Sequence, residues 1–207
     1  MSWKLAGLVA AGTLALMTYA RLVQGNETGT ASWDLSRATG YAGYLLLWGA
    51  VVTGMSVNLR IHPGLRHQGL VLELHRILST LGMAYIAVHT VGILMDPAVN
   101  FSIADGVIPF TSAYRPFAVG IGTIAQWLVA VALISTALSR RMPRSAWWWL
   151  HLLSYPAFVL SLLHGMLAGT DTQAAASMWM YVSTAGIVGA LTFARLLGRG
   201  WVTAAEA

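Results

Sequence analysis

The sequence predicts an all-α integral membrane protein: a bundle of six transmembrane helices that forms a single domain over residues 1–207. Of the 207 residues, 57% are hydrophobic and only 9% are charged, whereas roughly a quarter of the residues of a soluble domain are charged. The apolar residues gather in runs of about twenty, the length at which a helix crosses a bilayer. A membrane span must satisfy its backbone groups internally, so runs of this length indicate helices rather than strands.

The first apolar run, residues 5–23, has two interpretations. Lys4 precedes it and supplies the positive charge that a signal peptide requires. The run is long for the apolar region of a signal peptide, however, and no clear cleavage site of small residues follows it. We therefore expect a retained helix.

The other runs follow in order, each bounded by a short polar segment. The second run is rich in glycine, with Gly40, Gly43, Gly49 and Gly54, so a neighbouring helix can approach it closely. The longest connection, residues 96–115, is too short to fold on its own. The expected spans are residues 5–23, 38–57, 72–95, 116–138, 147–168 and 177–197.

The distribution of charge predicts the orientation in the membrane. Arginine is concentrated in the second and fourth connections and near the C-terminus, whereas Asp96, Asp105 and Asp171 lie in the third and fifth, and the first connection is mixed. The positive-inside rule then places both termini in the cytoplasm. Trp147, Trp148 and Trp149 fall at the cytoplasmic start of the fifth span, where an aromatic belt is expected. The net charge of +5 is scattered over the ends of the loops, so we expect no nucleic-acid partner.

The chain has no cysteine and six histidines. The lack of cysteine excludes disulfides, thiolate metal sites, iron–sulfur clusters and covalent haem attachment through CxxCH. Histidine is the plentiful strong metal ligand that remains. A histidine inside a membrane is costly, and so it is a candidate functional residue by default.

Two histidines lie in the third span. His75 and His89 are fourteen residues apart, which in a helix corresponds to a rise of ~21 Å and a rotation of only ~40°. One face of this helix therefore presents two imidazoles at two depths in the membrane.

The fifth span carries the other pair, His151 and His164. Spans three and five run in the same direction, so His75 and His151 lie at the inner depth, and His89 and His164 at the outer depth. Two imidazoles facing each other across a bundle form a bis-histidine haem site. The spacing of thirteen residues rotates His164 by ~140° from His151 in an ideal helix, and we expect the region of Pro156 to correct this.

The alternative interpretation is that these are packed histidines with hydrogen-bonded partners. The presence of four histidines at matching depths in two spans favours the haem site over this alternative. His62 and His67 lie in a basic connection. We expect them to be solvated, and the sequence leaves their role open.

The paired histidines and several local motifs resemble a known family. The segments HTVGILMD, VIPFTSAYRP and LLHGMLAGTD are similar to those of the ferric reductase-like transmembrane domain. That superfamily includes ferric reductases, NADPH oxidases and the bacterial haem-binding membrane subunit of periplasmic methionine sulfoxide reductase. The resemblance implies two b-type haems bound by His75, His89, His151 and His164, electron transfer across the membrane, and a place in the bacterial inner membrane.

The chain departs from the larger members of that superfamily because it has no Gly-rich dinucleotide motif of the kind their FAD and NADPH domains carry. We therefore expect a redox partner as donor, either a cytoplasmic flavin reductase or the quinone pool, so that FMN or quinone is a further cofactor to consider. An acceptor on the outer side would take the electrons.

Haem propionates are anionic and pair with arginine. Arg76 on the inner side, and Arg37 and Arg115 on the outer side, are the candidates for these contacts. Interfacial placement of the same side chains, with no haem contact, is an equally good explanation for each.

Together these observations predict a di-haem membrane cytochrome, the electron-transfer subunit of an oxidoreductase rather than a complete enzyme. Two other classes stay open. One is a haem-bearing structural subunit of a larger membrane complex. The other is a histidine-based proton or ion transporter, which would be expected to carry carboxylates inside its spans, where the predicted spans hold only Glu73 near an end.

Overall fold

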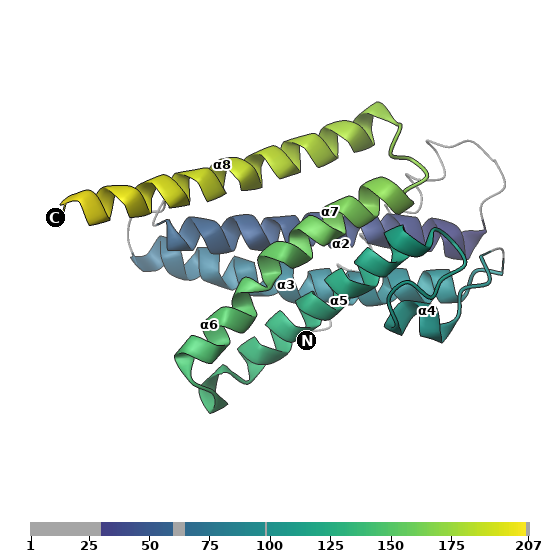
Figure 1. Ribbon diagram of the computed structural model, residues 1–207, viewed down its shortest axis with the longest axis horizontal. Helices are drawn as coiled ribbons and strands as arrows, with labels where there is room; N and C mark the ends of the chain where they lie inside the picture. The colour runs from purple at the N-terminus through teal and green to yellow at the C-terminus, as the bar shows by residue number, and fades with distance from the viewer. Residues whose placement is uncertain (1–29, 60–64, 98, 206–207) are drawn as a thin grey trace.

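The computed structural model describes residues 30–59, 65–97 and 99–205, which are largely helical and contain no strand (Figure 1). A short 3-10 turn, η1 (Ser139–Arg141), precedes α6. The α-helices are α2 (Ala31–Asn58), α3 (Leu65–Leu94), α4 (Ile103–Val107), α5 (Pro116–Ala137), α6 (Arg144–Leu152), α7 (Ser154–Ala168) and α8 (Ala175–Ala205). The predicted all-α class is therefore confirmed.

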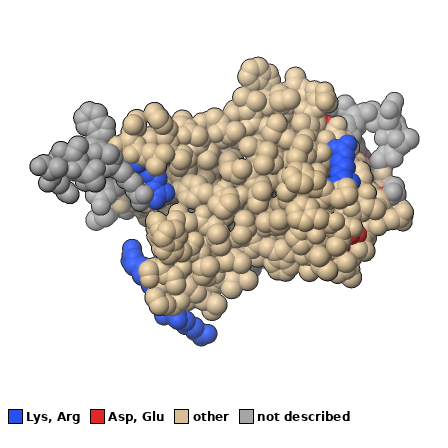
Figure 2. Space-filling view, in the orientation of Figure 1, with Lys and Arg blue, Asp and Glu red and all other residues tan. Residues whose placement is uncertain are grey.

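Five segments of the described chain are long and apolar enough to cross a membrane. They correspond to the second to sixth predicted spans, and the predicted first span, residues 5–23, lies outside the described residues. Figure 2 shows a middle band without charge on the visible face, with the charged side chains at its two ends. The five segments are Ala31–Asn58, Gln68–Leu94, Pro116–Ala137, Arg144–Ala168 and Ala175–Leu197.

Two helices begin seven residues before the predicted spans. Helix α2 begins at Ala31 because the Thr30 hydroxyl accepts the Trp33 backbone N–H and Asp34 lies in the first turn, both favourable at a helix N-terminus. Helix α3 begins at Leu65, so the prediction that His67 lies in a loop is wrong. The apolar pattern predicts span boundaries where polarity rises, but a helix continues into the polar interface wherever its backbone bonds can still form.

The fifth span is interrupted, because α6 ends at Leu152 and α7 begins at Ser154. Pro156 has no N–H to donate to the Leu152 carbonyl, and its ring clashes with that same carbonyl in a regular helix. The Leu153 N–H instead bonds the Leu150 carbonyl at 3.2 Å, one residue closer than in an α-helix. The expected correction near Pro156 is therefore present, three residues before the proline.

The bundle consists of two antiparallel hairpins and one flanking helix. Helix α2 packs along the length of α3, and α5 packs along α6 and α7. Helix α8 packs on α2 and α7 through a cluster of buried side chains that includes Tyr44, Phe158 and Tyr181. The hydroxyl groups of Tyr44 and Thr184 are hydrogen-bonded at 2.5 Å.

The α2–α3 contact depends on small residues, as the glycine-rich second run predicts. Gly92 of α3 is the tightest case against backbone, since a Cβ there would lie 3.1 Å from the Cα and the N of Ser36. Gly82 lies against Leu47 in the same interface. The close approach sets the position of α3 relative to α2, and with it the position of both α3 histidines.

We predict that Gly92→Ala lowers the free energy of unfolding by about 1–3 kcal/mol, because the added methyl group overpacks an interface whose backbone atoms cannot move aside. The measurement is unfolding by SDS in mixed micelles, followed by circular dichroism. Gly186→Ala is the matched control, since a Cβ added there would have no described atom within 4 Å. Equal effects of the two substitutions would contradict the proposed close contact.

Candidate functional site

The four histidines of the third and fifth spans meet in two pairs. The ring centres of His75 and His151 are 5.9 Å apart, and those of His89 and His164 are 6.0 Å apart. The pairs are those expected from the two membrane depths. The break at Leu153 allows this, because it separates His151 on α6 from His164 on α7 and removes the fixed rotation between them.

Three of the four rings are anchored to a helix backbone. Nδ1 of His75 lies 2.7 Å from the Ala50 carbonyl oxygen, Nδ1 of His89 lies 2.7 Å from that of Ser36, and Nδ1 of His164 lies 2.8 Å from that of Ala118. A carbonyl oxygen only accepts, so each Nδ1 carries the proton and donates it. The other nitrogen, Nε2, then keeps its lone pair, which is the form in which histidine binds a metal.

A glycine lies beside each anchored ring. A Cβ added at Gly54 would lie 3.2 Å from the His75 ring, one at Gly40 would lie 3.0 Å from the His89 ring, and one at Gly122 would lie closer still to the His164 ring. Sequence reasoning assigned the α2 glycines to helix packing and did not connect them with the histidines. A signal was available, because Gly40 and Gly54 are fourteen residues apart, the same spacing as His75 and His89.

His151 has different neighbours. Its Nδ1 lies 3.4 Å from the Thr136 hydroxyl, and its ring stacks on Trp147 with the ring centres 5.1 Å apart. Trp148 and Trp149 contact each other edge to face and are exposed, as an aromatic belt requires. Trp147 therefore differs from its two neighbours, since it faces the site.

The outer histidine pair lines an open pocket with about 1240 Å³ of space free of protein atoms, part of which is open solvent. Its walls come mainly from α2, α3, α5 and α7, with single residues of α4 and α8, and are largely apolar. Polar side chains in the lining include Arg37, Thr90, Tyr114, Gln126 and Asp171.

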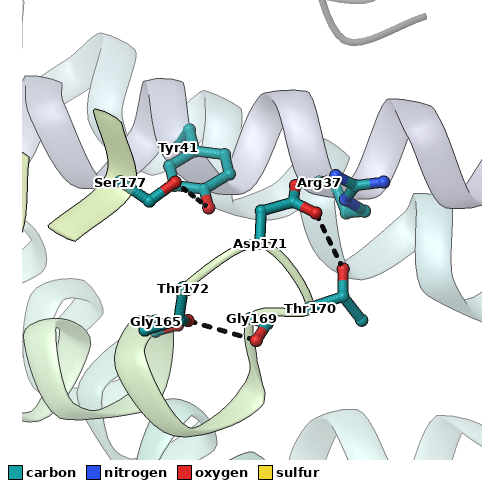
Figure 3. A network of polar contacts seen from close by, with 8 residues as sticks. All are labelled: Arg37, Tyr41, Gly165, Gly169, Thr170, Asp171, Thr172 and Ser177. Carbon is teal, nitrogen blue, oxygen red and sulfur yellow. Dashed lines mark hydrogen bonds and ion pairs between the residues drawn. The ribbon is translucent and has the colours of Figure 1, made fainter. Parts of the chain in front are cut away.

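Arg37 is the one candidate propionate-binding arginine that lines this pocket. It forms an ion pair with Asp171 of the α7–α8 loop, which Figure 3 shows beside it. The Thr170 hydroxyl donates to Asp171, and the hydroxyl groups of Tyr41 and Ser177 are 3.0 Å apart. These contacts hold the loop against α2 at the rim of the pocket.

The other two arginine candidates have other partners. Arg115 is exposed and donates from Nη1 to the Leu167 carbonyl at 2.7 Å, at the end of α7. Arg76 is exposed and pairs with Glu73 at 3.4 Å. Their contacts with a haem stay predictions. His67 lies in the first turn of α3, and His62 lies outside the described residues.

Helix α4, which the sequence did not predict, packs against α3 and α5 and contributes Gly106 to the lining of the pocket. Side chains of α5 donate to three successive α4 carbonyls: Thr123 to Asp105 at 3.3 Å, Gln126 to Gly106 at 3.3 Å, and Trp127 to Val107 at 2.9 Å. At the other end of α4, Ser102 and Asp105 form a reciprocal capping box. This short helix is held at both of its ends.

The fold and the site together define a class of protein. The described chain is a multi-pass membrane protein with two facing pairs of histidines inside its bundle, and no group of three or more His, Asp or Glu in the described residues is placed to hold a metal ion. The family described as ferric reductase like transmembrane component matches residues 38–162. The chain belongs to this family, and it is a membrane electron-transfer component. Comparison with curated proteins and with solved structures finds no match.

Members of this family typically bind haem, and the histidine pairs fit that group. A metal held between two imidazole nitrogens at about 2 Å, each nitrogen about 1 Å from its ring centre, places the ring centres about 6 Å apart. The observed separations are 5.9 Å and 6.0 Å. The anchored Nδ1 atoms leave Nε2 available as the ligand, as a bis-histidine site requires.

We predict that α4 loosens in acid. Hydrogen bonds from the Ser102 backbone N–H and hydroxyl lower the pKa of Asp105 below its ordinary value of 3.8. A lowered pKa means that this carboxylate stabilises the fold fully above its unfolded pKa, and that the contribution is lost as the pH falls through the folded pKa. Hydrogen exchange of residues 102–107, corrected for intrinsic rates, should therefore stay constant above about pH 5 and quicken as the pH falls below it.

The control is Asp105→Asn, which removes the titrating group. Its corrected exchange in this segment should be faster than that of the native chain at the upper pH and should change little with pH. An identical pH response in both proteins would show that Asp105 is not the group responsible.

Proposed function

We propose that this protein is a di-haem b-type membrane cytochrome that moves electrons across the membrane. His75 and His151 would hold the inner haem, and His89 and His164 the outer haem. The observation that carries the proposal is the pair of facing rings at each depth, with Nδ1 of three rings bound to backbone carbonyls. When bound, each haem supplies a one-electron iron couple.

The chain's own residues position and insulate these groups. The histidines of α3 set the two depths ~21 Å apart along one helix, most of the way across a ~30 Å hydrocarbon core. Buried side chains such as Tyr85 and Phe158 fill the bundle between the two depths and exclude water. Arg37, which lines the outer pocket, is the best placed of the three arginines to meet a propionate, with Arg76 and Arg115 as further candidates.

The charge distribution supports an orientation in the bacterial inner membrane. Arg140 and Arg141 lie in the turn that leads into α6, the helix that begins at Arg144 and carries His151, whereas Asp105 lies on α4 and Asp171 in the α7–α8 loop that lines the outer pocket. With six spans, including residues 5–23, this arrangement puts both termini in the cytoplasm.

A cytoplasmic flavin reductase or the quinone pool would deliver electrons near His75 and His151. An acceptor on the outer side would receive them near His89 and His164. FMN or a quinone would then bind at the donor end. The membrane lipid surrounds the apolar band between the two ends.

We predict that the haems can be removed one at a time. His89→Ala or His164→Ala should leave one haem per protein with the inner one retained, and His75→Ala or His151→Ala should leave the outer one. The haem-to-protein ratio by pyridine haemochrome, with redox titration of the absorbance bands, measures this. His67→Ala is the matched control and should keep both haems.

Colourless protein from haem-replete cells would contradict the cytochrome proposal and favour a transporter. If His75→Ala kept both haems, the assignment of pairs would be wrong.

We also predict that the bound haem is reached by a physiological donor. A quinol or a flavin reductase with NAD(P)H should reduce it in proteoliposomes, to the extent that dithionite does. The measurement is stopped-flow absorbance of the haem bands in the vesicles. Haem that only dithionite reduces would instead indicate a structural subunit whose cofactor holds an assembly together.

A further inference from the structure

The two helices that anchor the histidines follow one pattern. In α2, the carbonyls of Ser36 and Ala50 accept from His89 and His75, and glycines follow four residues later at positions 40 and 54. In α5, the Ala118 carbonyl accepts from His164, and Gly122 again follows four residues later. In each case the missing Cβ opens the path between ring and carbonyl.

The fourth position breaks the pattern. Fourteen residues after Ala118 and Gly122 come Ala132 and Thr136, as Ala50 and Gly54 come fourteen residues after Ser36 and Gly40. Thr136 therefore occupies the glycine position opposite His151. It carries the Cβ and the branched side chain that the other three positions lack.

The Thr136 hydroxyl takes the place of the bare carbonyl. It donates to the Ala132 carbonyl at 2.8 Å, the carbonyl that the pattern assigns to His151. It accepts the indole N–H of Trp147 at 3.3 Å and lies 3.4 Å from Nδ1 of His151. A hydroxyl has one proton and two lone pairs. Because the Thr136 hydroxyl donates its proton to the Ala132 carbonyl, it accepts from both Trp147 and His151.

We propose that Thr136 is the positioning residue of the inner histidine pair. Its hydroxyl lies between the Ala132 carbonyl and Nδ1 of His151 and accepts from that nitrogen in place of the carbonyl, while Trp147 stacks on the His151 ring. This inference rests on the proposed function and adds to it a built-in difference between the two sites. His151 donates to a hydroxyl over 3.4 Å, whereas the other three rings donate to carbonyls at 2.7–2.8 Å. A weaker hydrogen bond at Nδ1 makes His151 a less basic metal ligand than the other three histidines.

The test compares the full-length protein with Thr136→Val, which keeps the shape and removes the hydroxyl, and with Thr136→Ser, which keeps the hydroxyl. The rate of haem transfer to excess apomyoglobin and the low-spin EPR signal of each haem are measured. We expect Thr136→Val to weaken inner-haem binding about 10- to 100-fold, the range for loss of a residue that orients a metal ligand. The outer haem should be unchanged, and Thr136→Ser should restore the inner one.

Thr192→Val is the matched control, since Thr192 makes the same kind of bond to the Val188 carbonyl but lies on α8. Thr136→Ala, which removes the hydroxyl without adding a methyl group, guards against a packing effect of valine. If both hydroxyl-free variants retain the inner haem and its EPR signal as Thr192→Val does, the role of Thr136 is refuted while the di-haem proposal stands. Native protein that binds no haem would instead refute the proposed function itself.

Discussion

The arrangement of the site depends on one interaction, the donation of a histidine Nδ1–H to a backbone carbonyl inside a neighbouring helix. That carbonyl already accepts the helical N–H of the residue four positions later, and the histidine uses its second lone pair. Carbonyls point along the helix toward that same later residue, so a side chain there would block the approach. Glycine at positions 40, 54 and 122 is the consequence. The bond fixes both the tautomer and the direction of Nε2.

The spacing of the site follows from the helical repeat: the bond occurs twice between α2 and α3, and once between α5 and α7, with the Thr136 hydroxyl in the fourth place. Fourteen residues are close to four helical turns, so α2 and α3 return to the same relative orientation after that interval. Antiparallel packing then matches position 40 with His89 and position 54 with His75. In the α5 hairpin, Gly122 and Thr136 are fourteen residues apart on α5, but His151 and His164 are only thirteen apart on α6 and α7. The break at Leu153 compensates for this difference. Without that break, His151 and His164 would point in different directions.

The two ends of the bundle are built differently. The outer pair lines an open pocket whose lining includes the ion-paired Arg37 and Asp171 and also Gly106 of α4, a helix that α5 holds through three side-chain hydrogen bonds. The inner pair instead lies beside Trp147 and the Thr136 hydroxyl, next to the arginine-rich turn between α5 and α6. The two histidine pairs are therefore alike in ring separation but not in their surroundings.

The sequence by itself determined the membrane class, five of the helices and the division of the histidines into His75 with His151 and His89 with His164, because apolar length and helical periodicity are local properties. It did not determine where α2 and α3 begin, because capping by Thr30 and helix formation in a polar interface depend on single contacts. It did not predict α4, whose five residues are held by bonds to α5. Only the tertiary structure decided the role of Gly40, Gly54, Gly122 and Thr136. A glycine or threonine in an apolar helix has several uses, and the one that applies is fixed by the side chain that the neighbouring helix places against it.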